Sequence, residues 1–160
     1  MTPITMSFLL PKSTIDMERS RLAETTSTFE FLQCFAGTFE IRNLCGDSIL
    51  RLTDAPLFRL ARDLVEGLRT IVRAKSTVTI FDFYGEFELE IVRVGQQEIC
   101  IRKLGTEENV RASFSDLADS LHAALSLFLA SIDTLFPIAA ENADYKELRC
   151  QLKTPIEVAN

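Results

Sequence analysis

The stretch 81–91 constrains the fold more than any other part of the chain, because apolar and polar side chains alternate along it. Successive side chains of a β-strand point to opposite faces of the sheet, so this pattern predicts one strand with a buried and a solvated face. The residues expected in the core are Phe81, Phe83, Phe87, Leu89 and Ile91. Those expected on the solvated face are Asp82, Tyr84, Glu86, Glu88 and Glu90. The sequence therefore predicts a sheet with an open, acidic face.

Length and composition indicate a single globular domain over residues 1–160. Apolar residues make up 47% of the chain and charged residues 25%, which is ordinary globular usage. A chain of 160 residues buries enough surface to fold without a disulfide or a metal. The formal net charge of −6 repels phosphate groups, so neither nucleic acid nor a membrane surface is expected as a partner.

The four cysteines are far apart in the sequence and form no C-x-x-C motif, which disfavours a zinc site. We expect reduced thiols that are buried as small apolar side chains: Cys34, Cys45, Cys100 and Cys150. Because their number is even, a disulfide between two of them is the alternative. The first residues do not resemble a signal peptide, because no basic residue precedes Lys12 and Pro11 interrupts the apolar run. A cytoplasmic location is therefore predicted.

Residues 28–75 are expected to form a first unit, and residues 1–27 are left unassigned apart from a modest helix candidate at 13–23. Three short antiparallel strands are predicted at 28–35, 38–44 and 48–52, with a turn at Cys45-Gly46-Asp47. Apolar residues at helical spacing then predict a helix over 56–74 that packs through Leu60, Leu64 and Leu68, with Asp54 as its N-cap. Its other face is charged: Arg59, Arg62, Asp63, Glu66, Arg69 and Arg73.

Residues 76–136 are expected to form a second unit of the same kind. A strand from Ser76 runs through the acidic stretch, turns at 95–97 and returns over 98–104. A three-residue loop would place Ile91 opposite Ile101 and Glu90 opposite Arg102, which pairs core with core and opposite charges. A short edge strand is predicted at 110–112. Ser113, with Asp116, then resembles a capping box that opens a second helix, whose core face is Phe114, Leu117, Leu121, Leu125, Phe128 and Ile132.

The second helix is apolar on nearly every side between Leu121 and Phe136. The stretch 121–140 also contains charged residues and a proline, so we expect a buried helix rather than a membrane span. A helix that is apolar all round must be covered all round, either by a terminal segment or by a second copy of the protein. A homodimer through this helix is therefore one expectation. Residues 137–160 are expected to contain a short helix over 142–152 and a frayed tail.

Together these elements predict an α+β fold, with a mainly antiparallel sheet of about six strands and two amphipathic helices on one face. Gly37 and Gly85 open similar strands, and each is followed by a hairpin and a helix. A duplicated hairpin-plus-helix unit would explain this similarity. The alternative is that short strands resemble one another by chance.

No set of residues specifies a reaction. His122 is the only histidine, which excludes a metal site with several histidines and favours a structural role. Carboxylates on one strand face stand about 6.5–7 Å apart, a spacing that a metal or two catalytic acids could use. On an open face, however, carboxylates stay solvated. The common nucleotide-binding and hydrolase motifs are missing, so we expect no catalytic residue, no metal and no cofactor.

The expected function is the binding of a protein partner through the acidic stripe Asp82, Tyr84, Glu86, Glu88 and Glu90. One tyrosine among four acids combines an aromatic anchor with charges that steer a basic partner to the surface. The alternative for this face is that it only keeps the protein soluble. An enzyme that uses the strand carboxylates is a further alternative.

The run Gly85-Glu86-Phe87-Glu88-Leu89-Glu90-Ile91, the next glycine turn, Ile99-Cys100-Ile101 and the capped helix from Ser113 resemble the sheet-plus-helix immunity proteins of bacterial polymorphic toxin systems. The resemblance covers residues 76–135 and rests on pattern. It implies a protein that neutralises a cognate toxin, often a basic nuclease, by covering its active site or an adjacent surface. No functional residue is carried over by position. Acidic secretion chaperones, small α+β dimers that wrap an effector segment, are similar in composition and form the second reading.

Overall fold

The computed structural model describes residues 3–24, 31–74, 77–82, 85, 87–154 and 156. In these residues the chain has the expected α+β class, with seven strands and four α-helices. The strands form two antiparallel sheets rather than one. Sheet A contains, in spatial order, β1 (Ile4–Leu9), β2 (Ala36–Asn43) and β3 (Ser48–Pro56). Sheet B contains β4 (Val78–Phe81), β5 (Glu88–Arg93), β6 (Glu98–Lys103) and β7 (Asn109–Ser113).

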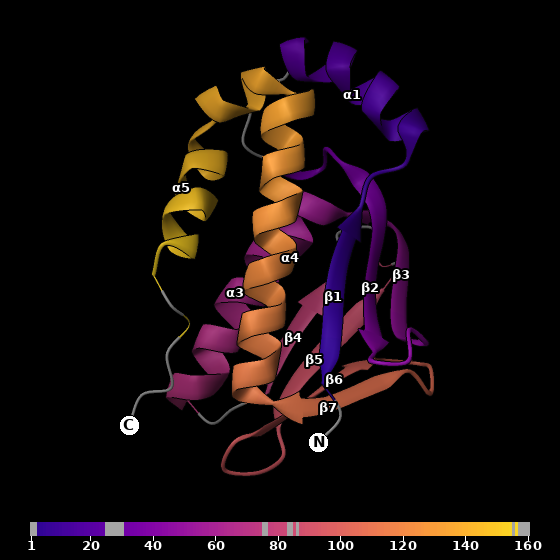
Figure 1. Cartoon of the computed structure of the whole chain (residues 1–160), viewed down its shortest axis with the longest axis vertical. Coiled ribbons are helices and arrows are strands. Elements are labelled where there is room, and N and C mark those ends of the chain that lie inside the picture. Colours follow the sequence, from indigo (N-terminus) through magenta and orange to yellow (C-terminus); the bar gives the residue numbers. More distant parts are fainter. Residues whose placement is uncertain are drawn as a thin grey trace.

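Two long helices, α3 (Leu57–Ala74) and α4 (Phe114–Leu135), pack against these sheets (Figure 1). The helix α1 (Lys12–Glu24) crosses one end of the molecule, and its range confirms the helix candidate at 13–23. The 3-10 helix η1 (Pro137–Glu141) leads into α5 (Ala143–Leu152), which lies beside α4 on the side away from β1 (Figure 1). Because α3 contacts strands of both sheets, a single apolar core joins them.

The helix α3 confirms the predicted range and the predicted buried face. Leu60, Leu64 and Leu68 are at most 1% exposed. The helix packs closely on sheet B at Gly67, where a Cβ atom would lie 2.9 Å from Cδ1 of Ile91. A glycine at this position therefore sets how near α3 can lie to the sheet. The predicted N-cap is wrong, because Asp54 lies within β3 at φ +53° and the helix starts directly after that strand.

The predicted strand over 28–35 is also wrong in its described part. Phe31 and Leu32 are helical, and the N–H of Cys34 donates to the carbonyl of Phe31 in the turn that follows. Phe31 and Phe35 are both buried, as expected. A spacing of four residues places two side chains on one face of a helix as well as of a strand, so the pattern alone does not separate the two. Residues 28–30 lie outside the described residues.

The second unit contains a hairpin that the sequence analysis did not predict. The stretch 81–91 is not one strand, since β4 and β5 are antiparallel neighbours with Phe81 opposite Glu88. The chain turns between Asp82 and Phe87, where the N–H of Gly85 donates to the carbonyl of Asp82 at 3.0 Å. Gly85 has φ +74°, a conformation that glycine adopts without steric strain. The turn consequently reverses the chain inside the alternating pattern.

The predicted register, edge strand, helix cap and helix core face of this unit are confirmed. Ile91 pairs with Ile101 and Glu90 with Arg102, and the loop between β5 and β6 lies at the predicted turn. β7 is the edge strand expected near 110–112. The hydroxyl of Ser113 accepts a hydrogen bond from the N–H of Asp116 at 3.0 Å, so Ser113 caps α4. All six residues of the predicted core face of α4 are buried.

The end of the described chain agrees with the predicted short helix. Asn142 caps α5 through its side-chain oxygen, which accepts hydrogen bonds from the N–H groups of Asp144 and Tyr145. Tyr145 and Leu148 are each 1% exposed. Of the two glycines that suggested a duplication, Gly37 lies within β2, whereas Gly85 lies in a turn. None of the helices in the described residues combines the length and apolar character that a membrane span requires.

Candidate functional site

The predicted acidic stripe is only partly present on the open face of sheet B. Leu89 and Ile91 are fully buried, so the side chains between and beside them point away from the core. Glu88 is exposed there, and the side chain of Glu90 is 17% exposed. Asp82 is 5% exposed, and its expected position on the solvated face is wrong. Tyr84 and Glu86 lie outside the described residues.

The hairpin explains why Phe81 and Asp82 exchange places relative to the prediction. Asp82 N–H donates to the carbonyl of Phe87, so these two residues pair across the ends of β4 and β5. Paired residues share a face, which puts Asp82 on the core side with Phe87. Phe81 was expected in the core, yet it lies on the outer face and is 60% exposed. An aromatic ring thus stands beside Glu88 where the prediction had only acids and Tyr84.

The open face of sheet B carries both signs of charge. On β6, Arg102 forms an ion pair with Glu90, the residue opposite it. Arg111 of β7 lies opposite Cys100 of β6, and Glu98 of β6 lies on the same face. The expected uniformly acidic face is therefore corrected to a mixed one. Glu88 is the acid next to Phe81, and in the described residues it forms no ion pair.

A groove runs between α3 and the free edge of sheet B. It is lined by β4 and by α3 residues that include Arg59, Asp63 and Glu66. β4 is an edge strand. The backbone N–H of Asp82 points to β5, and the direction of the backbone groups alternates along a strand, so those of Ile80 also point to β5. The backbone groups of Thr79 and Phe81 therefore point outward, away from the sheet. Asp63 forms ion pairs with two arginines of the groove. Its Oδ2 lies 3.4 Å from Nε of Arg59, and its Oδ1 lies 3.4 Å from Nη2 of Arg62. The exposed ring of Phe81 lies at the junction of this groove and the outer face.

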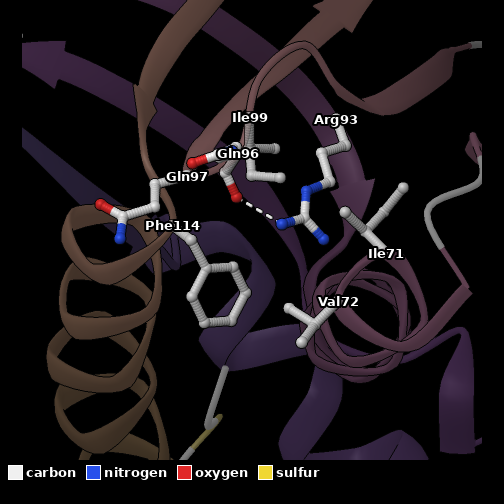
Figure 2. Close-up of a pocket in the computed structure, with 7 residues that line it drawn as sticks. All are labelled: Ile71, Val72, Arg93, Gln96, Gln97, Ile99 and Phe114. Atoms are coloured by element: carbon white, nitrogen blue, oxygen red, sulfur yellow. Dashed lines mark hydrogen bonds between the residues drawn. The ribbon is translucent and has the colours of Figure 1, made fainter. Parts of the chain in front are cut away.

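Figure 2 shows a small, partly open pocket at the other end of sheet B. Apolar side chains of Ile71, Val72, Ile99 and Phe114 line it. The guanidinium of Arg93 donates to the carbonyl oxygens of Gly95 and Gln96 and so fixes the β5–β6 loop over it. Its volume of about 20 Å³ is enough for about one water molecule and is far below that of a usual ligand pocket. This cavity is a packing feature.

Two buried acids, Glu40 and Glu18, have structural partners. Glu40, 2% exposed on β2, accepts a hydrogen bond from Nε of Arg42 at 2.7 Å. A hydrogen bond from the hydroxyl of Ser48 is the main reason that the pKa of Glu40 lies below its usual value of 4.5; Arg42 and Arg51 also lower it, while burial opposes them. Glu18, fully buried in α1, accepts the backbone N–H of Phe35. Neither carboxylate lines a cavity described above.

The single histidine and the cysteines form no reactive pair. Nε2 of His122 lies 3.1 Å from the carbonyl oxygen of Leu152 and links α4 to the end of α5. All four cysteines are free thiols. Cys34 and Cys100 are buried as expected, whereas Cys45 and Cys150 are exposed, which corrects the expectation that all four are buried. In the described part of the chain, no group of three or more acidic, histidine or cysteine side chains is arranged to hold a metal ion.

No protein-family model, curated protein or solved structure matches this chain. Its function must therefore be inferred from its own surface. Two features of that surface are unusual for a solvated sheet: the exposed ring of Phe81 and the open edge of β4 beside it. Sequence reasoning missed both, although Asp82-Phe83-Tyr84-Gly85 has aspartate at the first and glycine at the fourth position, which is a common type I turn signature.

Proposed function

We propose that this chain is a non-enzymatic protein-binding module of the bacterial cytoplasm that neutralises a basic toxin domain. The observation that carries the proposal is the pair formed by Phe81 and Glu88, both exposed and directly opposite each other on the outer face of sheet B. Glu90 extends the same face. A rigid sheet here presents an apolar ring next to carboxylates, which is the mixture expected of a protein interface.

Each member of the pair has a separate physical role. Complete burial of a phenylalanine side chain against a partner contributes about 1.5–3 kcal/mol, which makes Phe81 the anchor. The carboxylate of Glu88 raises the rate at which a basic partner arrives, because opposite charges steer diffusional encounter. Since Arg102 neutralises Glu90, Glu88 is the unpaired carboxylate beside Phe81 among the described residues. We therefore expect Phe81 to govern dissociation and Glu88 to govern association.

Two bulk properties support the rest of the proposal. The net charge of −6 favours a basic protein over a nucleic acid as partner. Four free thiols suit a reducing compartment such as the cytoplasm. The proposal includes neither a cofactor nor a catalytic residue. The stripe named from the sequence is kept in part, with Glu88 and Glu90 as its described, solvent-facing members and Phe81 as the anchor.

The proposal is tested by searching the neighbouring genes for a basic toxin domain and co-expressing that domain with the chain; a neighbourhood without one would count against the proposal. The parent chain should restore growth and form a complex with the toxin, whereas Phe81→Ala should mainly speed dissociation. Glu88→Lys should slow association and weaken its salt dependence. Leu44→Ala is the matched control, because Leu44 is 66% exposed outside sheet B.

Three outcomes would reject the proposal. Growth that is not restored by the parent chain would exclude neutralisation. Unchanged association and dissociation rates in both Phe81→Ala and Glu88→Lys would show that the interface lies on another surface. The arginines of the α3 groove would then be the next residues to test. A secreted effector segment in place of a toxin would identify the chain as a secretion chaperone.

A further inference from the structure

One side of α4 is exposed along several turns and carries no charge. Leu127 is 73% exposed, and Ala123, Ser126, Ala130 and Ser131 are exposed beside it. Between Asp119 and Asp133 the chain has no charged residue, and His122 is the only titratable one. In Figure 1, α4 lies between β1 and α5, and no described element crosses the side of the helix that faces the viewer.

The other long helix shows what a solvated face looks like in the same molecule. The side of α3 that is not buried carries charged residues, among them Arg62, Glu66 and Arg73. An exposed leucine surrounded by small uncharged side chains leaves apolar area in water with no compensating charge. The exposed side of α4 therefore resembles a protein interface, whereas the exposed side of α3 resembles an ordinary solvated surface.

We propose that two copies of this chain pair through α4 in an antiparallel arrangement about a two-fold axis close to Leu127. Ala123, Ser126, Leu127 and Ala130 form the four corners of a hole on the helix surface, and Leu127 is also the knob that fits such a hole. The same patch thus supplies both halves of the contact, which is what a two-fold interface requires. The alanines let the two helices approach closely.

The charges at the two ends of this face select the antiparallel direction. Asp119 is exposed near the start of α4, and Asp133 near its end holds Arg149 of α5, whose side chain is 48% exposed. Asp119 lies eight residues before Leu127 and Asp133 lies six residues after it. An antiparallel pair therefore brings Asp119 of one copy to the level of Arg149 of the other, whereas a parallel pair brings Asp119 next to Asp119.

A shallow groove beside this face of α4 leaves room for side chains of the second copy. It lies between β1 and α4, and Met6, Ala124 and Leu127 are among the residues that line it. The N–H of Met6 already donates to the hydroxyl of Ser120 at 2.8 Å, so the edge of β1 is tied to α4 there. The second copy consequently meets a firm surface formed by a helix and the strand bonded to it. This inference does not depend on the proposed toxin binding, because it concerns α4 and not the outer face of sheet B.

Size-exclusion chromatography with light scattering of the full chain tests the pairing. The parent chain should have twice the mass of 18.0 kDa that its sequence gives. Leu127→Glu should be monomeric and keep the thermal midpoint and circular dichroism of a folded protein, since this side chain is exposed in the single chain. Leu44→Glu makes the same change at another exposed leucine and should remain dimeric. A monomeric parent, or a dimer that survives Leu127→Glu, would overturn the proposal.

A charge exchange tests the direction of the pair. Asp119→Lys and Arg149→Glu each place two like-charged contacts in their own homodimer, and each should weaken it several-fold, because exposed ion pairs change an equilibrium by up to about fivefold apiece. An equimolar mixture of the two variants restores opposite charges at both contacts, so a heterodimer as tight as the parent is expected. If the mixture is no tighter than either variant, the antiparallel register is wrong. The Leu127→Glu monomer should still bind the toxin, because Leu127 lies outside the outer face of sheet B. Failure of the pairing can therefore be told apart from failure of the function proposed above.

Discussion

The side-chain oxygen Oε1 of Glu18 accepts a hydrogen bond from the backbone N–H of Phe35 at 3.3 Å, and both residues are completely buried. Phe35 has φ +65°, in the left-handed region that side chains larger than glycine seldom occupy. Its carbonyl accepts a second hydrogen bond from the N–H of Leu57 at 3.2 Å. Two distant segments, α1 and the start of α3, thus hold the chain in a strained turn just before β2.

Removal of the Glu18 carboxylate should destabilise this turn. Glu18→Ala leaves the buried N–H of Phe35 without its acceptor, which costs about 1–3 kcal/mol. Glu18→Gln should cost less, because an amide oxygen can still accept the hydrogen bond. Urea unfolding measures both losses against Met17→Ala, a change at a half-exposed neighbour on the same helix. Equal free energies of unfolding for Glu18→Ala and Met17→Ala would show that the hydrogen bond has no net effect.

Acid should destabilise the protein in part through Glu40. Because the pKa of Glu40 is lowered in the folded protein, its carboxylate favours the folded state above the unfolded pKa, and this contribution is lost as the pH falls through the folded pKa. The difference in unfolding free energy between the parent and Glu40→Gln should be largest near neutral pH. It should shrink as the pH is lowered below about 4.5.

Urea titrations at a series of pH values measure that difference. Glu107→Gln removes an exposed carboxylate and serves as the control. Its free energy of unfolding should follow that of the parent at every pH. A difference for Glu40→Gln that does not change with pH would mean that its carboxylate titrates equally in the folded and unfolded chains.

The hairpin between β4 and β5 should depend on Gly85. Any other residue at φ +74° is strained, so Gly85→Ala should cost about 1–2 kcal/mol. Gly95→Ala is the matched change in the next hairpin. Gly95 is not among the glycines with positive φ, and a Cβ there would meet its nearest neighbour at an ordinary 3.5 Å. Thermal unfolding of both variants should show the larger loss for Gly85→Ala, and the reverse order would contradict the turn described here.

The core contact of α3 should be among the most sensitive in the molecule. Leu64 is completely buried, and Leu64→Ala should cost about 2–5 kcal/mol through lost burial and a residual cavity. Leu44→Ala makes the same change at a leucine that is 66% exposed, and it should stay within about 0.5 kcal/mol of the parent. Denaturant unfolding compares them. A loss below about 0.5 kcal/mol for Leu64→Ala would reject the buried face of α3.

Long, periodic elements could be predicted from the sequence because their signal is repeated many times. The ranges and buried faces of α3 and α4 follow from apolar spacing over several turns, and the pairing of Ile91 with Ile101 follows from the length of one loop. The strand β1 carries the same kind of signal, with Ile4, Met6 and Phe8 buried in alternation, although it was left unassigned. Its pairing with β2 joins distant segments, and local pattern does not specify such a pairing.

The candidate site could not be predicted in full, because its geometry depends on one turn. The core-facing side chains have even numbers on β4 and odd numbers on β5, so the reversal at Gly85 shifts the alternation by one residue. Reading 81–91 as one strand keeps the odd-numbered positions inside throughout and therefore misses this shift. That reversal moves Phe81 to the surface and Asp82 into the interior. The division of the strands into two sheets is equally invisible in the local pattern, since it depends on which distant segments pair with one another.

Because α3 packs against both sheets, the molecule should respond as a whole. Leu57 at its start lies against Gly37 of sheet A, and Gly67 near its middle lies against Ile91 of sheet B. Neither sheet can open without exposing the helix that the other sheet also needs, so the two should exchange their amide hydrogens in a single cooperative event. A partner that binds only near Phe81 would then slow exchange in β1 and β2, far from any atom it touches.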